Sequence, residues 1–220
     1  MLVIVYSYHK IPAMKKAILI ILLFFAAIPL QAQECLNVKY KLRGYFYAGT
    51  SHEDSTALGG FYEDTNSPKP TNERIRQLSK PSQFQLIVKT DSLAEFQKGI
   101  KGFKVFLINN TDSIISLQAQ DSRLNLKRQV FYNNQWQDVE YLPSSWCGNS
   151  YHSVFIKPSE YWDFIAPCLR GKHQAKFRFE LAINEQEKIY SNEFSGSFNK
   201  SQLIKEQGHT PTSIMDPYDN

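Results

Sequence analysis

Strict alternation of apolar and polar side chains over residues 175–183 is the feature that most constrains how this chain can fold. Apolar residues fill the odd positions, and the even positions between them include Lys176, Arg178 and Glu180. Successive side chains of a β-strand point to opposite faces of the sheet, so a period of two buries one face and leaves the other in water. The segment therefore predicts a half-buried β-strand.

The same alternation, or a run rich in β-branched and aromatic residues, occurs in eight further segments. A turn signal at 109–112 also predicts that residues 114–117 return as the second arm of a hairpin. We expect an all-β fold, an antiparallel β-sandwich of immunoglobulin-like type with about eight or nine strands. The further predicted strands are 38–42, 84–88, 103–107, 114–117, 127–132, 135–142, 151–156 and 188–198.

Two short helical turns are predicted within this strand pattern. Ser92 is placed to cap a turn that carries Leu93 and Phe96 on one side. Ser159 is placed to cap a second turn over residues 160–165. Serine is a favoured N-cap residue because its hydroxyl accepts a hydrogen bond from a free backbone N–H of the first turn.

Residues 33–205 are predicted to form one domain with a polar insertion at 49–82, where glycine and proline occur among charged residues. A structureless loop of that length is uncommon within a compact domain, so the insertion is either mobile or contains a helical turn near 71–78. The tail, 206–220, has few apolar residues, and we expect it to be disordered.

The N-terminus has the three parts of a secretory signal peptide. Two lysines precede an apolar run at 17–30, and small residues follow it. Residues 1–32 are therefore predicted to be a signal peptide, with Met14 as a second candidate for the first residue. The apolar run is shorter than the roughly 20 residues of a transmembrane helix, so we expect export to the periplasm or the medium and no stable membrane anchor.

The formal net charge of +4 does not indicate nucleic-acid binding, because the excess lies at the N-terminus. The only charged residues before Gln33 are Lys10, Lys15 and Lys16, and without them the net charge falls to +1. A basic surface for a nucleic acid is therefore not expected.

Three cysteines, Cys35, Cys147 and Cys168, occur in a chain that we expect in an oxidising compartment, where disulfides persist. We predict a Cys147–Cys168 bond, because these two residues bracket one patterned region, whereas Cys35 lies at the expected mature N-terminus. The alternative is that all three are unpaired and packed as small apolar residues.

The sequence contains no recognised catalytic or metal-binding motif. Cys147 lies near His152, as a nucleophile and its base would, but the surrounding residues match no cysteine-protease signature. The histidines that follow the signal peptide are far apart and have no HExxH or similar ligand spacing. We therefore predict no catalytic residues, no bound metal and no other cofactor.

Aromatic residues near turns and strand ends are the remaining candidates for a binding surface. Trp146, Tyr151, Tyr161 and Trp162 lie near the predicted disulfide, which would hold their rings rigid. Rigid aromatic rings lose little conformational entropy on binding, and they suit either a protein or a glycan partner. These four residues are the predicted binding residues.

The end of the signal peptide, the turn at 109–112 and the stretch Ser-Trp-Cys-Gly-Asn-Ser-Tyr at 145–151 resemble those of uncharacterised exported β-sandwich proteins of Bacteroidota. The resemblance covers about residues 84–198. It implies export and a β-sandwich fold, and it implies no activity.

Two functions from different classes are compatible with these observations. The first is an exported, non-enzymatic module that binds a protein or a glycan. The second is a small secreted hydrolase whose catalytic carboxylates are dispersed in the sequence and face each other across a groove at roughly 5 to 9 Å. The candidate carboxylates are Glu140, Glu160, Asp163, Glu180 and Glu193.

Overall fold

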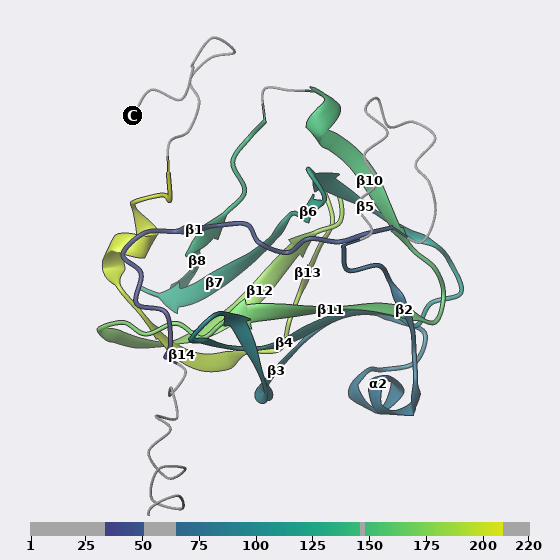
Figure 1. Ribbon diagram of the computed structural model, residues 1–220, viewed down its shortest axis with the longest axis horizontal. Coiled ribbons are helices and arrows are strands. Elements are labelled where there is room, and N and C mark those ends of the chain that lie inside the picture. Colours follow the sequence, from purple (N-terminus) through teal and green to yellow (C-terminus); the bar gives the residue numbers. More distant parts are fainter. Residues whose placement is uncertain (1–33, 51–64, 146–147, 209–220) are drawn as a thin grey trace, which may run out of the picture. The chain divides into compact units, whose positions relative to one another are not determined.

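The computed structural model describes residues 34–50, 65–145 and 148–208, and all of them belong to one compact unit. Antiparallel β-sheets make up most of these residues, so the all-β prediction is confirmed (Figure 1). The strands form two large sheets that pack face to face and two small sheets at their margins.

One large sheet has the antiparallel strand order β2-β11-β4-β3. Its strands are β2 (Lys69–Pro70), β11 (Glu160–Pro167), β4 (Ile100–Asn109) and β3 (Phe84–Gln97). Strand β4 is buried on both faces. Val105 and Leu107 belong to the main core, whereas Phe106 and Ile108 pack with Ile75 of the helix α2 (Glu73–Leu78). Burial on both faces explains why β4 is an apolar run with few polar positions.

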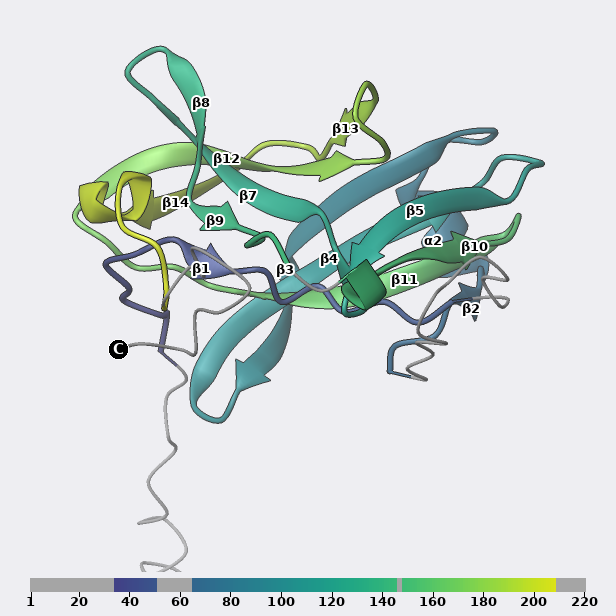
Figure 2. The ribbon, with the colours of Figure 1, turned by 90° about the horizontal axis from the view of Figure 1, so that it is seen from above.

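The other large sheet has the order β13-β12-β7-β8, and β14 also pairs with β12. Its strands are β13 (Lys188–Tyr190), β12 (His173–Ala182), β7 (Leu126–Tyr132), β8 (Gln135–Asp138) and β14 (Phe194–Phe198). In Figure 2 this sheet lies above β4 and β11. Phe179 and Leu181 of β12 pack into the main core, which confirms the alternating strand predicted there.

Two small sheets complete the fold. An antiparallel sheet has the order β10-β5-β6, and a two-stranded parallel sheet pairs β1 with β9. Leu117 of β5 and Ile156 of β10 join the main core, so these strands extend the sandwich. The elements are β10 (Tyr151–Ile156), β5 (Ile115–Gln120), β6 (Arg123–Leu124), β1 (Leu42–Arg43), β9 (Glu140–Tyr141) and the 3-10 helices η1 (Gly148–Ser150) and η2 (Lys200–Leu203).

The predicted hairpin across 109–112 is wrong, because the chain passes there from one sheet to another. Strand β4 pairs with β3 and β11, whereas β5 pairs with β10 and β6. Asn109 is fully buried at the crossing, where its Nδ2 donates to Ser113 O at 2.8 Å and to Ile156 O at 3.1 Å. Residues that favour a turn fix its local shape, but they do not determine which strand it leads to.

Both helical turns predicted at Ser92 and Ser159 are wrong, since the residues after them lie in β3 and β11. Strand β3 has a bulge between Lys89 and Leu93, which interrupts the period of two and imitates helical spacing. Strand β11 has Trp162 in the main core and Tyr161 in the cluster beneath α2, so both of its faces carry apolar residues. Neither segment shows the clean alternation of a strand with one exposed face.

The helix predicted near 71–78 is confirmed as α2. Its N-cap is Asn72, whose Oδ1 accepts a hydrogen bond from Ile75 N at 3.1 Å. The strand predicted at 38–42 is wrong over most of its length, because only Leu42 belongs to β1, Lys41 forms an isolated bridge with Glu206, and the chain bends at residues 39–40. Part of the predicted insertion, 51–64, and most of the predicted tail, 209–220, lie outside the described residues.

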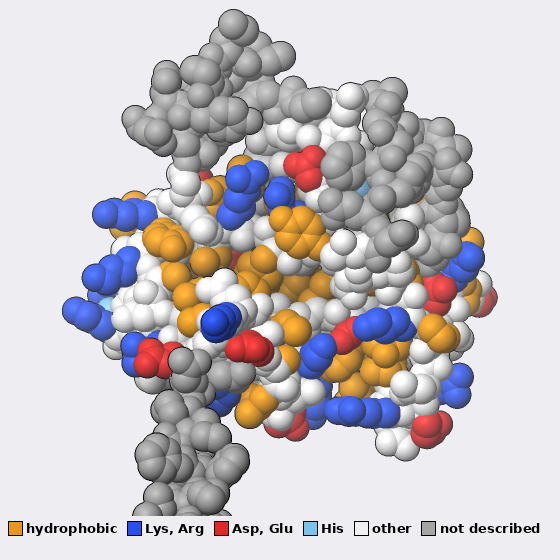
Figure 3. All heavy atoms as spheres, viewed as in Figure 1, with side chains coloured by type: hydrophobic (Ala, Val, Ile, Leu, Met, Phe, Trp, Pro, Cys, Tyr) orange, Lys and Arg blue, Asp and Glu red, His pale blue; other side chains and the backbone are white. Residues whose placement is uncertain are grey.

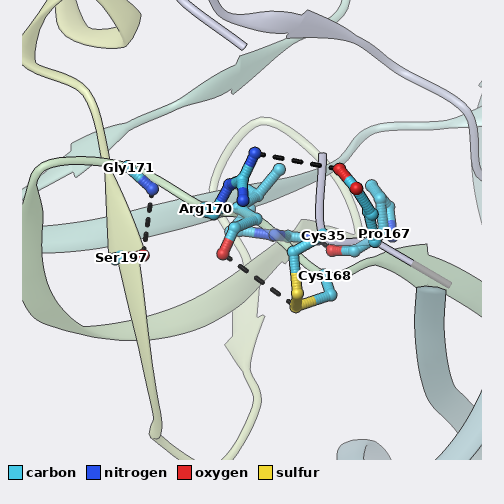
Figure 4. Close-up of a disulfide and its surroundings, with 9 residues drawn as sticks. Cys35, Pro167, Cys168, Arg170, Gly171 and Ser197 are labelled. Carbon is cyan, nitrogen blue, oxygen red and sulfur yellow. Dashed lines mark hydrogen bonds and ion pairs between the residues drawn. A yellow bond between two sulfur atoms is a disulfide. The ribbon is translucent and has the colours of Figure 1, made fainter. Parts of the chain in front are cut away.

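The disulfide joins Cys35 to Cys168, which corrects the predicted Cys147–Cys168 bond (Figure 4). Cys147 lies outside the described residues. The N-terminal segment runs beside the end of β11, where Leu36 N donates to Cys168 O at 2.7 Å and Arg170 N donates to Leu36 O at 3.0 Å. The assumption that the chain frays at Cys35 was wrong, since backbone pairing holds Cys35 next to Cys168.

We predict that replacing both Cys35 and Cys168 with alanine lowers the free energy of unfolding by about 2–5 kcal/mol. The reason is that the bond closes a long loop, with a sequence separation of 133 residues, which restricts the unfolded chain. Urea unfolding measures the loss. Cys147→Ser is the control and should leave the unfolding midpoint unchanged. A large loss of stability in that variant would favour a Cys147–Cys168 bond instead.

Candidate functional site

A cavity opens between the two large sheets next to the disulfide, and we call it the edge cavity. Its volume is about 140 Å³, and Cys168 contributes to its lining. Apolar side chains from both sheets and from the segment after β11 form most of its wall: Leu93, Phe103, Leu169, Phe177 and Phe194. Its polar lining residues are Thr90, Lys101, Arg128, Ser195 and Ser197.

The edge cavity lies where the edges of β3 and β14 face each other. Among the described strands, β3 pairs only with β4, and β14 pairs only with β12. Asn192 links the two sheets above the cavity, because its Oδ1 accepts from Val88 N at 2.8 Å and its Nδ2 donates to Val88 O at 3.1 Å. Beyond Val88 the β3 bulge begins, and the cavity occupies the space between the two edges.

Two local features shape the walls of this space. Leu93, where β3 resumes its pairing after the bulge, is 61% exposed although it lines the cavity. Gly196 of β14 faces Phe177, and a Cβ atom at this position would lie 2.9 Å from the Phe177 ring. Glycine therefore lets the ring approach the backbone of β14, where a larger residue would collide with it.

The polar group at the inner end of the cavity is Arg128, which is 1% exposed. Its Nη2 donates to Pro167 O at 2.9 Å and to Tyr45 Oη at 3.1 Å, and its Nε lies 3.2 Å from Glu140 Oε1. Phe103 and Phe179 place their rings 5.6 and 5.0 Å from the guanidinium carbon. The guanidinium is held rigidly by contacts from both sheets.

Glu140 is as deeply buried as Arg128, and its carboxylate accepts three contacts. Tyr45 Oη donates to Oε1 at 2.6 Å, Arg128 N donates to Oε2 at 2.9 Å, and the guanidinium forms the ion pair. Burial raises the pKa of Glu140, although Arg128 and the Tyr45 hydrogen bond act in the opposite direction. Burial likewise raises the pKa of Tyr45 well above its usual value.

Sequence reasoning missed this cluster, although a signal was present. Leu126, Arg128 and Val130 alternate on β7 and are all buried, so the arginine occupies a position where the period predicts an apolar residue. Charged residues are almost never fully buried without a partner. An arginine at an inward position therefore signals a buried acid elsewhere, which here is Glu140.

Trp162, one of the four predicted binding residues, is in the core. It is fully buried, and its Nε1 donates to Gly49 O at 3.1 Å. The expectation that Trp162 offers a ring to a partner is therefore wrong. The helical turn assumed after Ser159 obscured the period of two, which places Trp162, Phe164 and Ala166 on the inner face of β11.

Tyr151 and Tyr161 are not brought together with Trp162. Tyr161 is half-buried on the opposite face of β11, where it packs with Phe106. Tyr151 is 46% exposed at the start of β10, and its Oη accepts from Ser145 N at 2.9 Å. Trp146 lies outside the described residues. A binding role for Trp146, Tyr151 and Tyr161 stays a prediction.

The dispersed carboxylates are paired with cations or with backbone groups. Asp163 binds Lys69 and Lys104, Glu180 binds Lys188 at 2.8 Å, and Glu193 binds Lys176 at 2.9 Å. Glu160 Oε2 accepts from Lys157 N at 2.9 Å. These contacts do not resemble two catalytic carboxylates that face each other across an open groove.

Glu180 and Asp138 share a donor on the outer face of β7, β8 and β12. Gln129 Nε2 donates to Asp138 Oδ1 at 2.9 Å and to Glu180 Oε2 at 3.1 Å. Arg178 covers them, with its guanidinium carbon 4.3 Å from the Trp136 ring and 3.8 Å from the Tyr190 ring. The side chains in this part of the face therefore bind one another.

Charges of both signs are dispersed over the face of the molecule in Figure 3, with small hydrophobic groups between them. Within the described residues, no three His, Cys, Asp or Glu side chains are placed to hold a metal ion. In the same part of the chain, no helix is long and apolar enough to cross a membrane.

Comparison with protein-family models, curated proteins and solved structures finds no match to this chain.

We predict that Glu140→Gln lowers the free energy of unfolding by about 3–5 kcal/mol, because Arg128 would keep a buried charge without its counter-ion. Urea unfolding followed by tryptophan fluorescence measures this loss. The matched control is Glu193→Gln, which breaks an exposed ion pair with Lys176 and should cost less than about 1 kcal/mol. Equal losses in the two variants would contradict a stabilising role for the buried pair.

Stability should also depend on pH through Asp163. Burial raises its pKa, but hydrogen bonds from Lys104 and Lys69 outweigh burial and hold the pKa below its ordinary value. The ionised carboxylate therefore stabilises the fold above the unfolded pKa of roughly 3.9, and this contribution is lost as the pH falls through the lower folded value.

We predict that Asp163→Asn lowers stability at neutral pH by less than about 1 kcal/mol, since the group is partly solvated. The difference from the unmodified protein should shrink as the pH falls from about 5 to 2. Chemical unfolding at a series of pH values tests this, with Asp112→Asn in an exposed turn as the control. A difference that stays constant at acid pH would contradict the assignment.

Proposed function

We propose that the protein is an exported, non-enzymatic binding module whose edge cavity receives an apolar side chain of a protein partner. The lining of the cavity carries the proposal, because its walls are apolar and include no carboxylate or imidazole. The hydroxyls of Thr90, Ser195 and Ser197 have no carboxylate or imidazole beside them in the lining to act as a general base. Apolar walls with a few fixed polar groups are typical of binding sites.

The two strand edges beside the cavity support a protein partner. An extended peptide can add to the edge of a sheet through its backbone while a pocket selects one of its side chains. The cavity lies between the edges of β3 and β14, and Leu93 stands exposed at its opening. Large exposed apolar side chains beside a cavity often belong to an interface.

A glycan partner has less support. Sugars stack on open aromatic faces, but Trp162 is buried and Arg178 stacks against both Trp136 and Tyr190. The alternative function as a hydrolase has less support for the same kind of reason, since its candidate carboxylates are engaged by lysines and backbone groups.

Export rests on two observations that agree. The first residues carry the charged and apolar pattern of a signal peptide. The Cys35–Cys168 bond is a feature of proteins that fold in oxidising compartments. The immunoglobulin-like arrangement of the sandwich stays a prediction.

The proposal is tested by passing a soluble library of random peptides with free termini over the immobilised full domain and identifying the peptides that it retains. We predict that the retained peptides share an apolar residue and that Leu93→Asp weakens their binding at least tenfold, because a charge would stand in the apolar wall. The control is Ile114→Asp, which introduces the same charge at a residue that is 49% exposed and does not line the cavity.

Peptides that bind the Leu93→Asp variant as tightly as the unmodified protein would overturn the proposed site. Binding to a glycan array without binding to any peptide would overturn the proposed class of partner. Circular dichroism of both variants confirms that they are folded, so that a loss of binding is not a loss of structure.

A further inference from the structure

The polar lining of the edge cavity is asymmetric in charge. Two cations, Arg128 and Lys101, contribute to it, and no carboxylate does. Glu140 approaches Arg128 but is not a lining residue. An anionic group that entered the cavity would therefore meet donors and positive charge without facing an acid.

Arg128 has an unused donor at this position. Its Nη2 donates to Pro167 O and to Tyr45 Oη, and its Nε lies 3.2 Å from Glu140 Oε1 but forms no hydrogen bond. Within the described residues, no hydrogen bond is formed by Nη1. Arg128 lines the cavity, so a ligand in the cavity lies beside its guanidinium. An anionic oxygen atom that accepts from this guanidinium forms a charge-assisted hydrogen bond, which is stronger than one between neutral groups.

Lys101 supplies net charge, which the neutralised Arg128 does not. It forms no ion pair among the described residues. The residue opposite in the β3–β4 register is Glu95, and its Oε1 accepts from Gly99 N at 2.8 Å. Arg128 thus provides a fixed hydrogen-bond donor, and Lys101 provides a mobile positive charge.

The cavity volume of about 140 Å³ limits what can accompany the anionic group. Pockets for drug-sized ligands have roughly 300–1,000 Å³, so this cavity holds about one side chain. An aspartate or glutamate side chain would not cover the rings of Phe103, Phe177 and Phe194. The last residue of a polypeptide, in contrast, carries a side chain and a carboxylate on one Cα atom.

We propose that the edge cavity binds the free C-terminus of a partner chain whose last residue is apolar. The terminal carboxylate accepts from Arg128 Nη1 and faces Lys101, while the terminal side chain packs among the phenylalanine rings. Capture of a C-terminal carboxylate next to a strand edge is an established mode of peptide recognition. This inference rests on the proposed function and adds the identity of the bound group.

Fluorescence polarisation with a labelled heptapeptide that ends in phenylalanine tests the inference. The peptide with a free C-terminal carboxylate should bind at least tenfold more tightly than the same peptide with a C-terminal amide. Lys101→Gln should reduce this ratio several-fold. The matched control is Lys98→Gln, at an exposed lysine in the same hairpin that does not line the cavity, and it should leave the ratio unchanged.

The role of Arg128 is tested by NMR on the unmutated protein, since replacing this buried residue would disturb the core. NMR signals of its guanidinium nitrogens should shift on addition of the free-acid peptide and stay in place on addition of the amide. Equal affinities for acid and amide, both weakened by Leu93→Asp, would overturn the carboxylate inference and leave the proposed function standing. Binding of neither peptide would overturn both.

The same carboxylate chemistry could come from a small apolar acid. 3-Phenylpropionate serves as the probe, because it presents a phenyl ring and a carboxylate without a peptide bond. If it displaces the heptapeptide at equal concentration, the assignment to a polypeptide C-terminus is overturned in favour of a small acid. If displacement needs a large excess, the contacts of the peptide backbone contribute and the assignment is supported.

Discussion

The buried pair of Arg128 and Glu140 is the interaction on which the rest of the structure depends. Arg128 lies on β7 of one large sheet, yet its guanidinium donates to Pro167 at the end of β11 in the other. Tyr45 from the N-terminal segment bonds both charged groups. Removing two charges from water costs several kcal/mol per ion, and good geometry with additional hydrogen bonds is needed to offset it. The cluster therefore fixes how the sheets and the N-terminal segment pack together.

The Cys35–Cys168 disulfide strengthens the same corner of the molecule. Cys168 follows Pro167, the residue that accepts from Arg128, so the covalent bond and the buried ion pair act on adjacent residues. Gly171 follows on this segment, and a Cβ atom there would lie 2.1 Å from the carbonyl carbon of Phe198. Close backbone packing, a disulfide and an ion pair together hold the walls of the edge cavity, which preorganises it for a ligand.

The sequence allowed most strands to be predicted but not their partners or the site. Alternation identified β12 and the first part of β3, where apolar and polar residues alternate. It failed in the second part of β3, where a bulge interrupts the period of two, and at β11, where apolar residues on both faces hide it. It also failed at the turn after Asn109, where pairing is decided by distant strands. The cysteine pairing failed for the same reason, since contacts between residues 133 apart have no local signal.

The missed site also shows what an exception to a pattern can reveal. Arg128 breaks the alternation of β7, and Gly196 leaves an inward position of β14 without a side chain beside Phe177. Each is unfavourable alone: the arginine needs a buried counter-ion, and the glycine gives up packing. Together they place a rigid donor at the inner end of an open apolar cavity. A side chain at residue 196 would collide with the Phe177 ring, which forms part of the cavity wall, so Gly196 shapes the apolar wall of the cavity while Arg128 supplies its polar end.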